Sequence, residues 1–242
     1  MFWKNKRVTP LATSSTSRRR FIPFALLAVL VVLSGVAALS SYGFHPISGV
    51  VGPEDVVVTN EPALAPASSS ATGATVDGIT CRTSSVEVVK YHVHVYVTFF
   101  VYGRQERLPA GIGITTPFLN EHLSSGNFID VGAYDCLYWL HTHVGDGIIH
   151  VEAPTKSSFT LGQFFDVWRQ PLSSTQVGPA TGSVVVFSNG RRVSGNPRDV
   201  ILRPNGDLQI DVGSPVVAFQ PFTYHVTGLC GAGTLSCFVP TK

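Results

Sequence analysis

The sequence contains little charge and lacks the short motifs that identify several common chemistries. Only 13% of its 242 residues are charged, and it has no Gly-x-Ser-x-Gly elbow, no His-Glu-x-x-His pair and no phosphate-binding glycine loop. These motifs mark α/β-hydrolases, one large group of zinc proteases and nucleotide-binding folds, respectively. Because these motifs are absent, no motif in the sequence supports assignment to any of those three protein classes.

Basic residues are also scarce outside the N-terminus. Residues 1–20 contain six of the 17 basic residues and no acidic one, so the rest of the chain carries 11 basic against 15 acidic residues, a net charge of −4. A mildly acidic body without a basic, aromatic-rich patch is a poor partner for a phosphate backbone. We therefore do not expect nucleic acid as a partner.

A long uncharged stretch follows this basic N-terminus. Residues 21–39 form a run of 19 uncharged residues directly after Arg18–Arg20, and the next charged residue is Glu54. Such a run is long enough to cross a bilayer, and the arginines would keep the N-terminus in the cytoplasm. The small residues around Ala38–Ser40 also allow a cleaved signal. The arginines resemble a twin-arginine export signal as well.

These features divide the chain into four parts. We expect a basic cytoplasmic tail over 1–20, a transmembrane anchor or signal segment over 21–42, a disordered Pro/Ala/Ser-rich tether over 43–79, and an exported domain over 80–242. The predicted location is the cytoplasmic membrane with the domain on the extracytoplasmic side, or secretion if the signal is cleaved. The oligomeric state stays open.

The cysteine count agrees with export. The four cysteines are Cys81, Cys136, Cys230 and Cys237, an even set that favours disulfides in an exported protein. Cys230 and Cys237 are close enough to close a glycine-rich loop, which leaves Cys81 to pair with Cys136. Metal ligation by Cys136 is the alternative, although no Cys-x-x-Cys pair is present.

Short apolar runs separated by turn residues predict an all-β fold. We expect a sandwich or open barrel of short antiparallel strands with one or two short helices, preceded by the N-terminal transmembrane helix. The expected strands cover about 86–102, 107–114, 184–187 and 192–193, and Asn205-Gly206 is expected to join 200–202 to 208–212. Thr160 and Gln163 have the spacing of a capping box before a short helix, and Thr116-Pro117 could start another.

Five of the eight histidines lie in two short segments. One segment is His92-Val93-His94, and the other runs from His141-Thr142-His143 to His150-Val151-Glu152. Side chains alternate between the two faces of a strand, so each His-x-His pair places two imidazoles on one face. If the strand around His92 neighbours the 137–144 strand, one surface collects five imidazoles beside Glu152.

The turn between the last two histidines sets the expected register. An Asp146-Gly147 two-residue hairpin would place His143 opposite His150 and His141 opposite Glu152. A three-residue loop with a bulge at Gly145 or Gly147 would change that register. On the same strand, Trp139 would lie on the same face as His141 and His143 and could form one side of a pocket.

The candidate metal ligands are therefore His92, His94, His141, His143, His150 and Glu152. Imidazoles with one carboxylate suit Zn²⁺, Cu²⁺, Fe²⁺ or Ni²⁺ and not Ca²⁺ or Mg²⁺. Three readings stay open: a metal-binding protein, a metal-dependent hydrolase or oxidoreductase with Glu152 as ligand or general base, and a structural or adhesive surface module without metal. The remaining histidines, His45, His122 and His225, are expected to be structural or solvated.

The Cys136–His143 block with Gly147–Glu152, together with Tyr91–His94, Pro109–Ile114 and Thr160–Phe165, resembles a group of uncharacterised exported bacterial proteins. The resemblance covers roughly residues 80–225 and implies export, but no activity is assigned to that group. Its members often carry Asp directly after the second histidine of the block, where this chain has Val144. If that Asp is a ligand, this chain has lost it.

Overall fold

The structure is a computed structural model that describes residues 50–51, 56–58, 60–67, 72–83, 89–115, 120–123, 126–129 and 136–224. The chain divides into two units, Met1–Pro46 and Ile47–Lys242, and every described residue belongs to the second. The predicted segment 21–42 lies outside the described residues, as do Thr116-Pro117, Cys230 and Cys237. Within the described ranges, no helix is long and apolar enough to cross a membrane.

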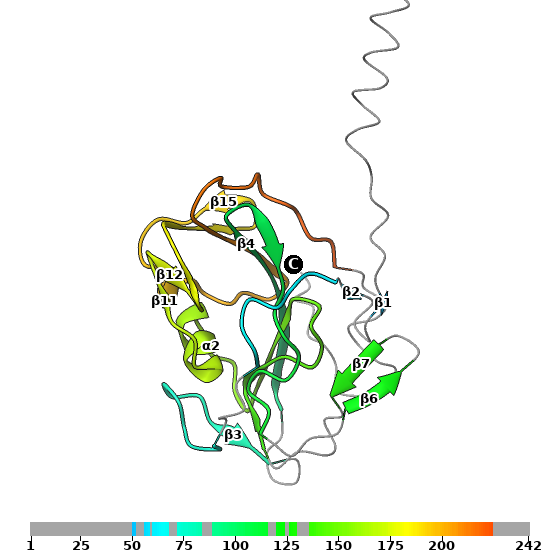
Figure 1. Ribbon diagram of the computed structural model, residues 1–242. Coiled ribbons are helices and arrows are strands. Elements are labelled where there is room, and N and C mark those ends of the chain that lie inside the picture. The colour runs from blue at the N-terminus through cyan, green and yellow to red at the C-terminus, as the bar shows by residue number, and fades with distance from the viewer. Residues whose placement is uncertain are drawn as a thin grey trace, which may run out of the picture. The chain divides into compact units, whose positions relative to one another are not determined.

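The main sheet is open and contains seven strands (Figure 1). Its order is β15 (Arg191–Arg192), β14 (Val184–Ser188), β16 (Gly206–Val212), β4 (Tyr91–Val101), β10 (Ile148–Ala153) and β9 (Leu140–His141), with β5 (Arg104–Glu106) beside β4. All neighbours are antiparallel except β16 and β4, which are parallel. The expectation of purely antiparallel pairing is therefore wrong at this one pair, whose strands are far apart in the sequence.

Smaller elements surround this sheet. Three are strand pairs: β1 (Val50–Val51) with β2 (Val57–Val58), β3 (Cys81–Arg82) with β8 (Leu137–Tyr138), and β6 (Asn120–Leu123) with β7 (Gly126–Ile129). A three-stranded sheet contains β11 (Leu172–Ser173), β12 (Gln176–Val177) and β13 (Ala180–Thr181). The remaining elements are the helix α2 (Leu161–Trp168) and the 3₁₀ turn η1 (Pro197–Asp199). The fold is mostly strand and sandwich-like, as the sequence predicts.

The core lies on one face of the main sheet. On β4, Val93, Val95, Val97 and Phe99 alternate toward it and are buried. Helix α2 adds Phe164, Phe165 and Trp168 to the same cluster. The predicted capping box is confirmed, because Gln163 N donates to Thr160 Oγ1 at 3.2 Å and Thr160 N donates to Gln163 Oε1 at 3.0 Å.

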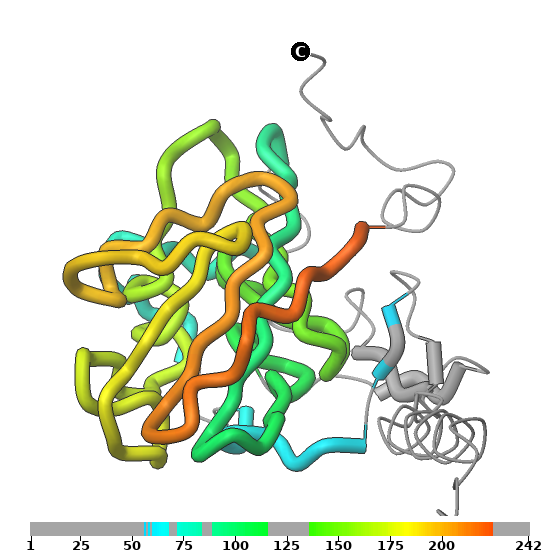
Figure 2. The backbone as a smooth tube through the Cα atoms, turned by 90° about the horizontal axis from the view of Figure 1, so that it is seen from above, coloured from blue at the N-terminus to red at the C-terminus, as the bar shows by residue number. Residues whose placement is uncertain are grey.

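The opposite face of the sheet carries polar side chains. Next to β4, strand β16 presents Asp207, Gln209 and Asp211 at alternate positions, and all three are buried. They are covered by residues 215–224, which we call the strap and which cross the sheet at the C-terminal end of the described chain (Figure 2). The side chains accept backbone N–H groups of the strap at 2.7–2.8 Å.

The strap ends beside the histidine-bearing strand. Tyr96 N donates to Tyr224 Oη at 2.6 Å, and the Tyr96 ring stacks on Phe222 with centroids 3.9 Å apart. Tyr96 lies two residues from His94 on the same face of β4. The strap therefore covers the Tyr96 end of the face predicted from the alternation of β4.

Two further differences from the sequence-based expectations concern other segments. Residues 200–202 do not pair with 208–212, because β16 already has β14 on one edge and β4 on the other, and Ile201 instead bridges to Thr160. Within the predicted tether, Leu64 and Ala65 are buried in the core, and Leu64 N donates to Arg107 O at 3.0 Å. The folded domain thus includes residues that precede Cys81.

Candidate metal centre

Three adjacent strands bring the predicted ligands together. Strand β10 lies between β4 and β9, and its residue His150 is directly opposite His94 on one side and His141 on the other. Glu152, two residues further along β10, is opposite His92. The expected gathering on one face is observed, but β4 reaches it through β10 and not by pairing with the 137–144 strand.

The predicted hairpin register is wrong by two residues. His150 faces His141, whereas an Asp146-Gly147 two-residue loop would have placed it opposite His143. Strand β9 ends at His141, so residues 142–147 form a longer loop. In that loop Asp146 Oδ1 accepts Ile148 N at 2.9 Å, and Gly147 has φ +91°, a conformation that favours glycine. A shift by two residues keeps every side chain on its original face, so the candidate ligands still converge.

Thr142 anchors the backbone between His141, the last residue of β9, and His143 in the loop. Its hydroxyl donates to Pro109 O at 2.8 Å and accepts Ile112 N at 3.0 Å. Thr142 N also donates to Ile112 O at 3.0 Å. Since Thr142 is bound to residues 109–112, the positions of His141 and His143 on either side of it are constrained.

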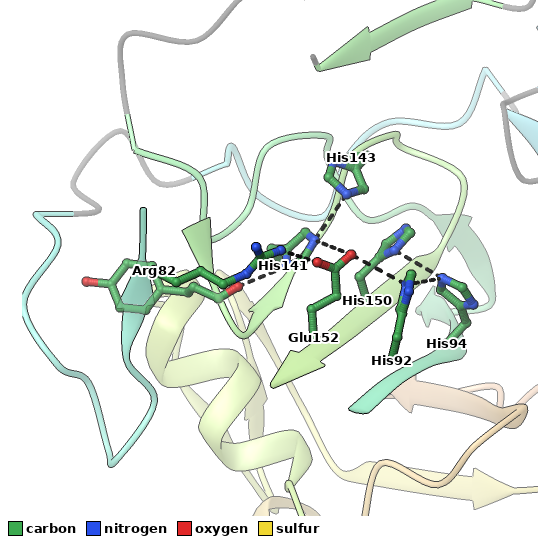
Figure 3. A network of polar contacts seen from close by, with 8 residues as sticks. Arg82, His92, His94, His141, His143, His150 and Glu152 are labelled. Atoms are coloured by element: carbon green, nitrogen blue, oxygen red, sulfur yellow. Dashed lines mark hydrogen bonds and ion pairs between the residues drawn. The ribbon is translucent and has the colours of Figure 1, made fainter. Parts of the chain in front are cut away.

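His141 is oriented by a backbone carbonyl. Its Nδ1 lies 2.8 Å from Tyr138 O, so Nδ1 carries the proton and donates it. The Nε2 lone pair then points into the cluster, where His143 Nε2 lies at 3.1 Å (Figure 3). A ligating histidine almost always donates its other ring N–H to a carbonyl, a carboxylate or water, and His141 already has this arrangement.

Glu152 is oriented by Arg82, which was not among the candidate residues identified from the sequence. The Arg82 guanidinium donates to Glu152 Oε2, and the other oxygen, Oε1, lies 3.4 Å from His92 Nε2 and 3.8 Å from His141 Nε2. Arg82 lies on β3 next to Cys81, whose disulfide to Cys136 is present as predicted. Its position beside a bridged cysteine is the only signal in the sequence that could have indicated it.

The remaining histidines form a chain of close ring contacts. His92 Nε2 lies 3.1 Å from His94 Nε2, which in turn lies 3.1 Å from His150 Nδ1. In a tetrahedral site with metal–nitrogen bonds of about 2.0–2.1 Å, two ligand nitrogens are roughly 3.3–3.4 Å apart. The nitrogen spacings in this cluster are therefore close to those of metal-bound imidazoles.

Burial controls the electrostatics of the cluster. Burial and the neighbouring His143 lower the pKa of His141 well below its ordinary value, and burial together with His141 does the same to the pKa of His150. Burial alone would raise the pKa of Glu152, but its electrostatic interactions with the neighbouring His92, His150 and Arg82 outweigh burial, and the pKa lies below its ordinary value. Neutral imidazoles beside an ionised carboxylate are the forms that ligate a metal.

Two groups of side chains in the described chain could hold a metal ion. They are His141, His143, His150 with Glu152, and His92, His94 with His150, and in each group one ligand atom per residue lies within 4.8 Å of the others. All six predicted ligands belong to one group or the other. Four of the five imidazoles are buried, completely for His141, whereas the side chain of His92 is 25% exposed.

The other predicted site residues lie elsewhere or are not described. His122 is on strand β6, where a short helix was expected, and His45 and His225 lie outside the described residues. Trp139 packs edge-on against Phe159, with ring centroids 6.2 Å apart, and joins the hydrophobic core. Cys136 is engaged in the disulfide, which removes it from the candidate ligands.

Comparison with known proteins adds no further assignment. No protein-family model, no curated protein and no solved structure matches this chain.

Proposed function

We propose that this protein binds a transition-metal ion through His141, His143, His150 and Glu152. The observation that carries the proposal is the fully buried His141, whose Nδ1 donates to a backbone carbonyl while its Nε2 lies 3.1 Å from His143 Nε2 and 3.8 Å from Glu152 Oε1. Three nitrogens and one oxygen suit Zn²⁺, Cu²⁺, Fe²⁺ or Ni²⁺. His92 and His94 complete the cluster.

The burial of so many imidazoles supports a ligand role over a structural one. Removing polar groups from water costs free energy unless each finds a partner, and the ring nitrogens of this cluster converge on one another at 3.1 Å in the buried interior. A metal ion accepts the lone pairs of such nitrogens together. A structural or adhesive module would need no such arrangement.

Binding without chemistry is the favoured version of this function. A general base works best with a pKa near the operating pH, whereas the pKa of Glu152 is lowered and its Oε2 is bound by Arg82. Glu152 therefore suits a ligand better than a base. The metal-dependent enzyme stays the alternative, with an open position next to His92, whose side chain is 25% exposed.

We further propose that the domain acts outside the cytoplasm, tethered to the membrane through residues 21–42 or secreted. A disulfide such as Cys81–Cys136 is typical of proteins in an oxidising compartment. The basic residues before the uncharged stretch support the same orientation. A topology reporter fused after residue 224 should be active only outside the cytoplasm.

Metal analysis of the full chain tests the main proposal. The protein, stripped with a chelator, is offered Zn²⁺, Cu²⁺, Fe²⁺ and Ni²⁺ in turn, and its metal content is measured after desalting. We expect at least one ion per chain for one of these metals and its loss in His143→Ala with an unchanged circular dichroism spectrum. His225→Ala is the control. If the wild type retains none of the four metals above background, the histidines are structural. The protein is then the structural or adhesive surface module without metal.

A further inference from the structure

The six candidate ligands divide into two sets that share one residue. His141, His143 and Glu152 form one set with His150, and His92 and His94 form the other with the same His150. We call them the inner set and the outer set. Figure 3 shows His150 between the His141/His143 pair and the His92/His94 pair.

The shared position of His150 follows from the sheet. Strand β10 lies between β4 and β9, so the imidazole of His150 has a histidine of β4 on one side and a histidine of β9 on the other. Its ring centroid lies 4.5 Å from that of His94, 5.2 Å from that of His141 and 4.5 Å from that of His143. It is therefore within ligand-sharing distance of both sets at once.

The two ring nitrogens of His150 can serve different sets. Nδ1 faces the outer set, because it lies 3.1 Å from His94 Nε2. The two nitrogens of an imidazole point away from each other, so Nε2 is directed away from His94 and can serve the inner set. Glu152 Oε1 also lies between the sets, 3.4 Å from His92 Nε2 and 3.8 Å from His141 Nε2.

Building on the proposed function, we propose that the site takes two transition-metal ions, one in each set, bridged by His150 as an imidazolate. A neutral imidazole has one lone pair for a metal, so it can ligate only one ion. Ligation of the second ion requires loss of the remaining N–H proton of His150, which passes to solvent. Each chain that fills both sets therefore releases one proton from His150 that single-ion binding does not release.

The two sets are not equivalent. The inner set contains the carboxylate and the fully buried His141, whereas the outer set has only imidazoles and includes His92, with a 25% exposed side chain. Repulsion between two cations in one buried cluster weakens binding of the second. The inner set should fill first and the outer set should exchange its ion faster. Three imidazoles without a carboxylate favour Cu²⁺, the strongest binder of nitrogen ligands among the divalent ions.

A copper titration of the full chain tests the inference. We expect Cu²⁺ uptake in two steps that end at two ions per chain. The electron paramagnetic resonance signal should grow with the first equivalent and decrease with the second, because an imidazolate bridge couples the two unpaired electrons antiferromagnetically. A chelator should then remove one ion quickly and the other slowly.

Variants separate this inference from the proposed function. His92→Ala and His94→Ala should each bind one Cu²⁺ with an uncoupled signal, and two variants are used so that a folding defect in one leaves the other informative. His225→Ala should behave as the wild type. Saturation of the wild type at one ion, or at two ions with an undiminished signal, would overturn the bridged pair and leave the proposed function standing. Uptake of no Cu²⁺ would also overturn the bridged pair, and only failure to take up any of the four metals would overturn the proposed function.

Discussion

The Nδ1 atom of His141 lies 2.8 Å from the carbonyl oxygen of Tyr138, three residues earlier in the chain. The chain bends at Trp139, between β8 and β9, and this bend lets the carbonyl reach the ring. The contact selects one tautomer of His141 before any metal is present. In the proposed metal complex, a side chain already oriented for ligation would lose less conformational freedom on binding.

We first predict that His141 of the metal-free protein is the Nδ1–H tautomer at neutral pH. The donor at Nδ1 has its acceptor in Tyr138 O, and the lowered pKa of His141 keeps the ring neutral. Nitrogen-15 chemical shifts of the labelled imidazole distinguish the two tautomers. An Nε2–H tautomer for His141 would contradict the orientation described above.

Arg82 is expected to tune metal affinity without being a ligand. It holds Glu152 Oε2 and leaves Oε1 directed at the histidines. Substitution of a group that orients a ligand typically weakens metal binding by about 10–100-fold. We therefore expect Arg82→Met to lower the affinity by this amount and Arg82→Lys to restore part of it, measured by competition with a chromophoric chelator. Unchanged affinity in Arg82→Met would show that Glu152 does not ligate.

The pH dependence of stability follows from the buried histidines. The folded-state pKa values of His141 and His150 are lowered below the unfolded value of about 6.5, so the unfolded chain binds more protons below that pH. The free energy of unfolding of the metal-free protein should therefore be fully present above about pH 6.5 and decrease as pH falls below it. The lowered pKa of Glu152 adds a loss of the same sign in a more acidic range.

Urea unfolding with a chelator present, at pH values from 8 to 5, measures this trend. The free energy of unfolding should fall less steeply with decreasing pH in His141→Ala, because this variant lacks one of the two buried histidines, His141 and His150. A free energy of unfolding that stays level or rises as the pH falls would contradict the assigned directions.

The Cys81–Cys136 disulfide should contribute to both stability and metal affinity. It joins the region of Arg82 to the strand that leads into His141. The two cysteines are 55 positions apart in the sequence. Loss of a native disulfide of this kind typically costs about 2–5 kcal/mol. We expect Cys136→Ala to unfold at lower denaturant concentration and, where still folded, to bind metal more weakly. Equal midpoints for the variant and the wild type would contradict this expectation.

The capping box of α2 offers a test of the fold that is independent of the metal. Thr160 Oγ1 accepts Gln163 N, and removal of a Ser or Thr cap typically costs about 1 kcal/mol. Thr160→Ala should lower the free energy of unfolding by about that amount, while Thr160→Ser should retain most of it. Metal content should be equal in all three proteins. A loss of metal in Thr160→Ala would show that α2 supports the site more directly.

The sequence by itself determined which residues share a face. The strands at His92 and His94, at His141 and at His150 each place side chains alternately on two faces. This alternation depends only on the two-residue period of a β-strand, so the candidate ligands could be identified without tertiary information. The capping box is equally local, because its signal lies within four residues.

Tertiary structure decided how these faces meet. The hairpin register depended on the contacts of Thr142 with residues 109–112, and the order β4-β10-β9 depended on which strand edges were left for pairing. Arg82 reaches Glu152 across 70 positions of sequence, and the strap covers β16 through buried carboxylates. No local period encodes such contacts, because they arise only when segments distant in sequence compete for the same sheet edges and the same buried space.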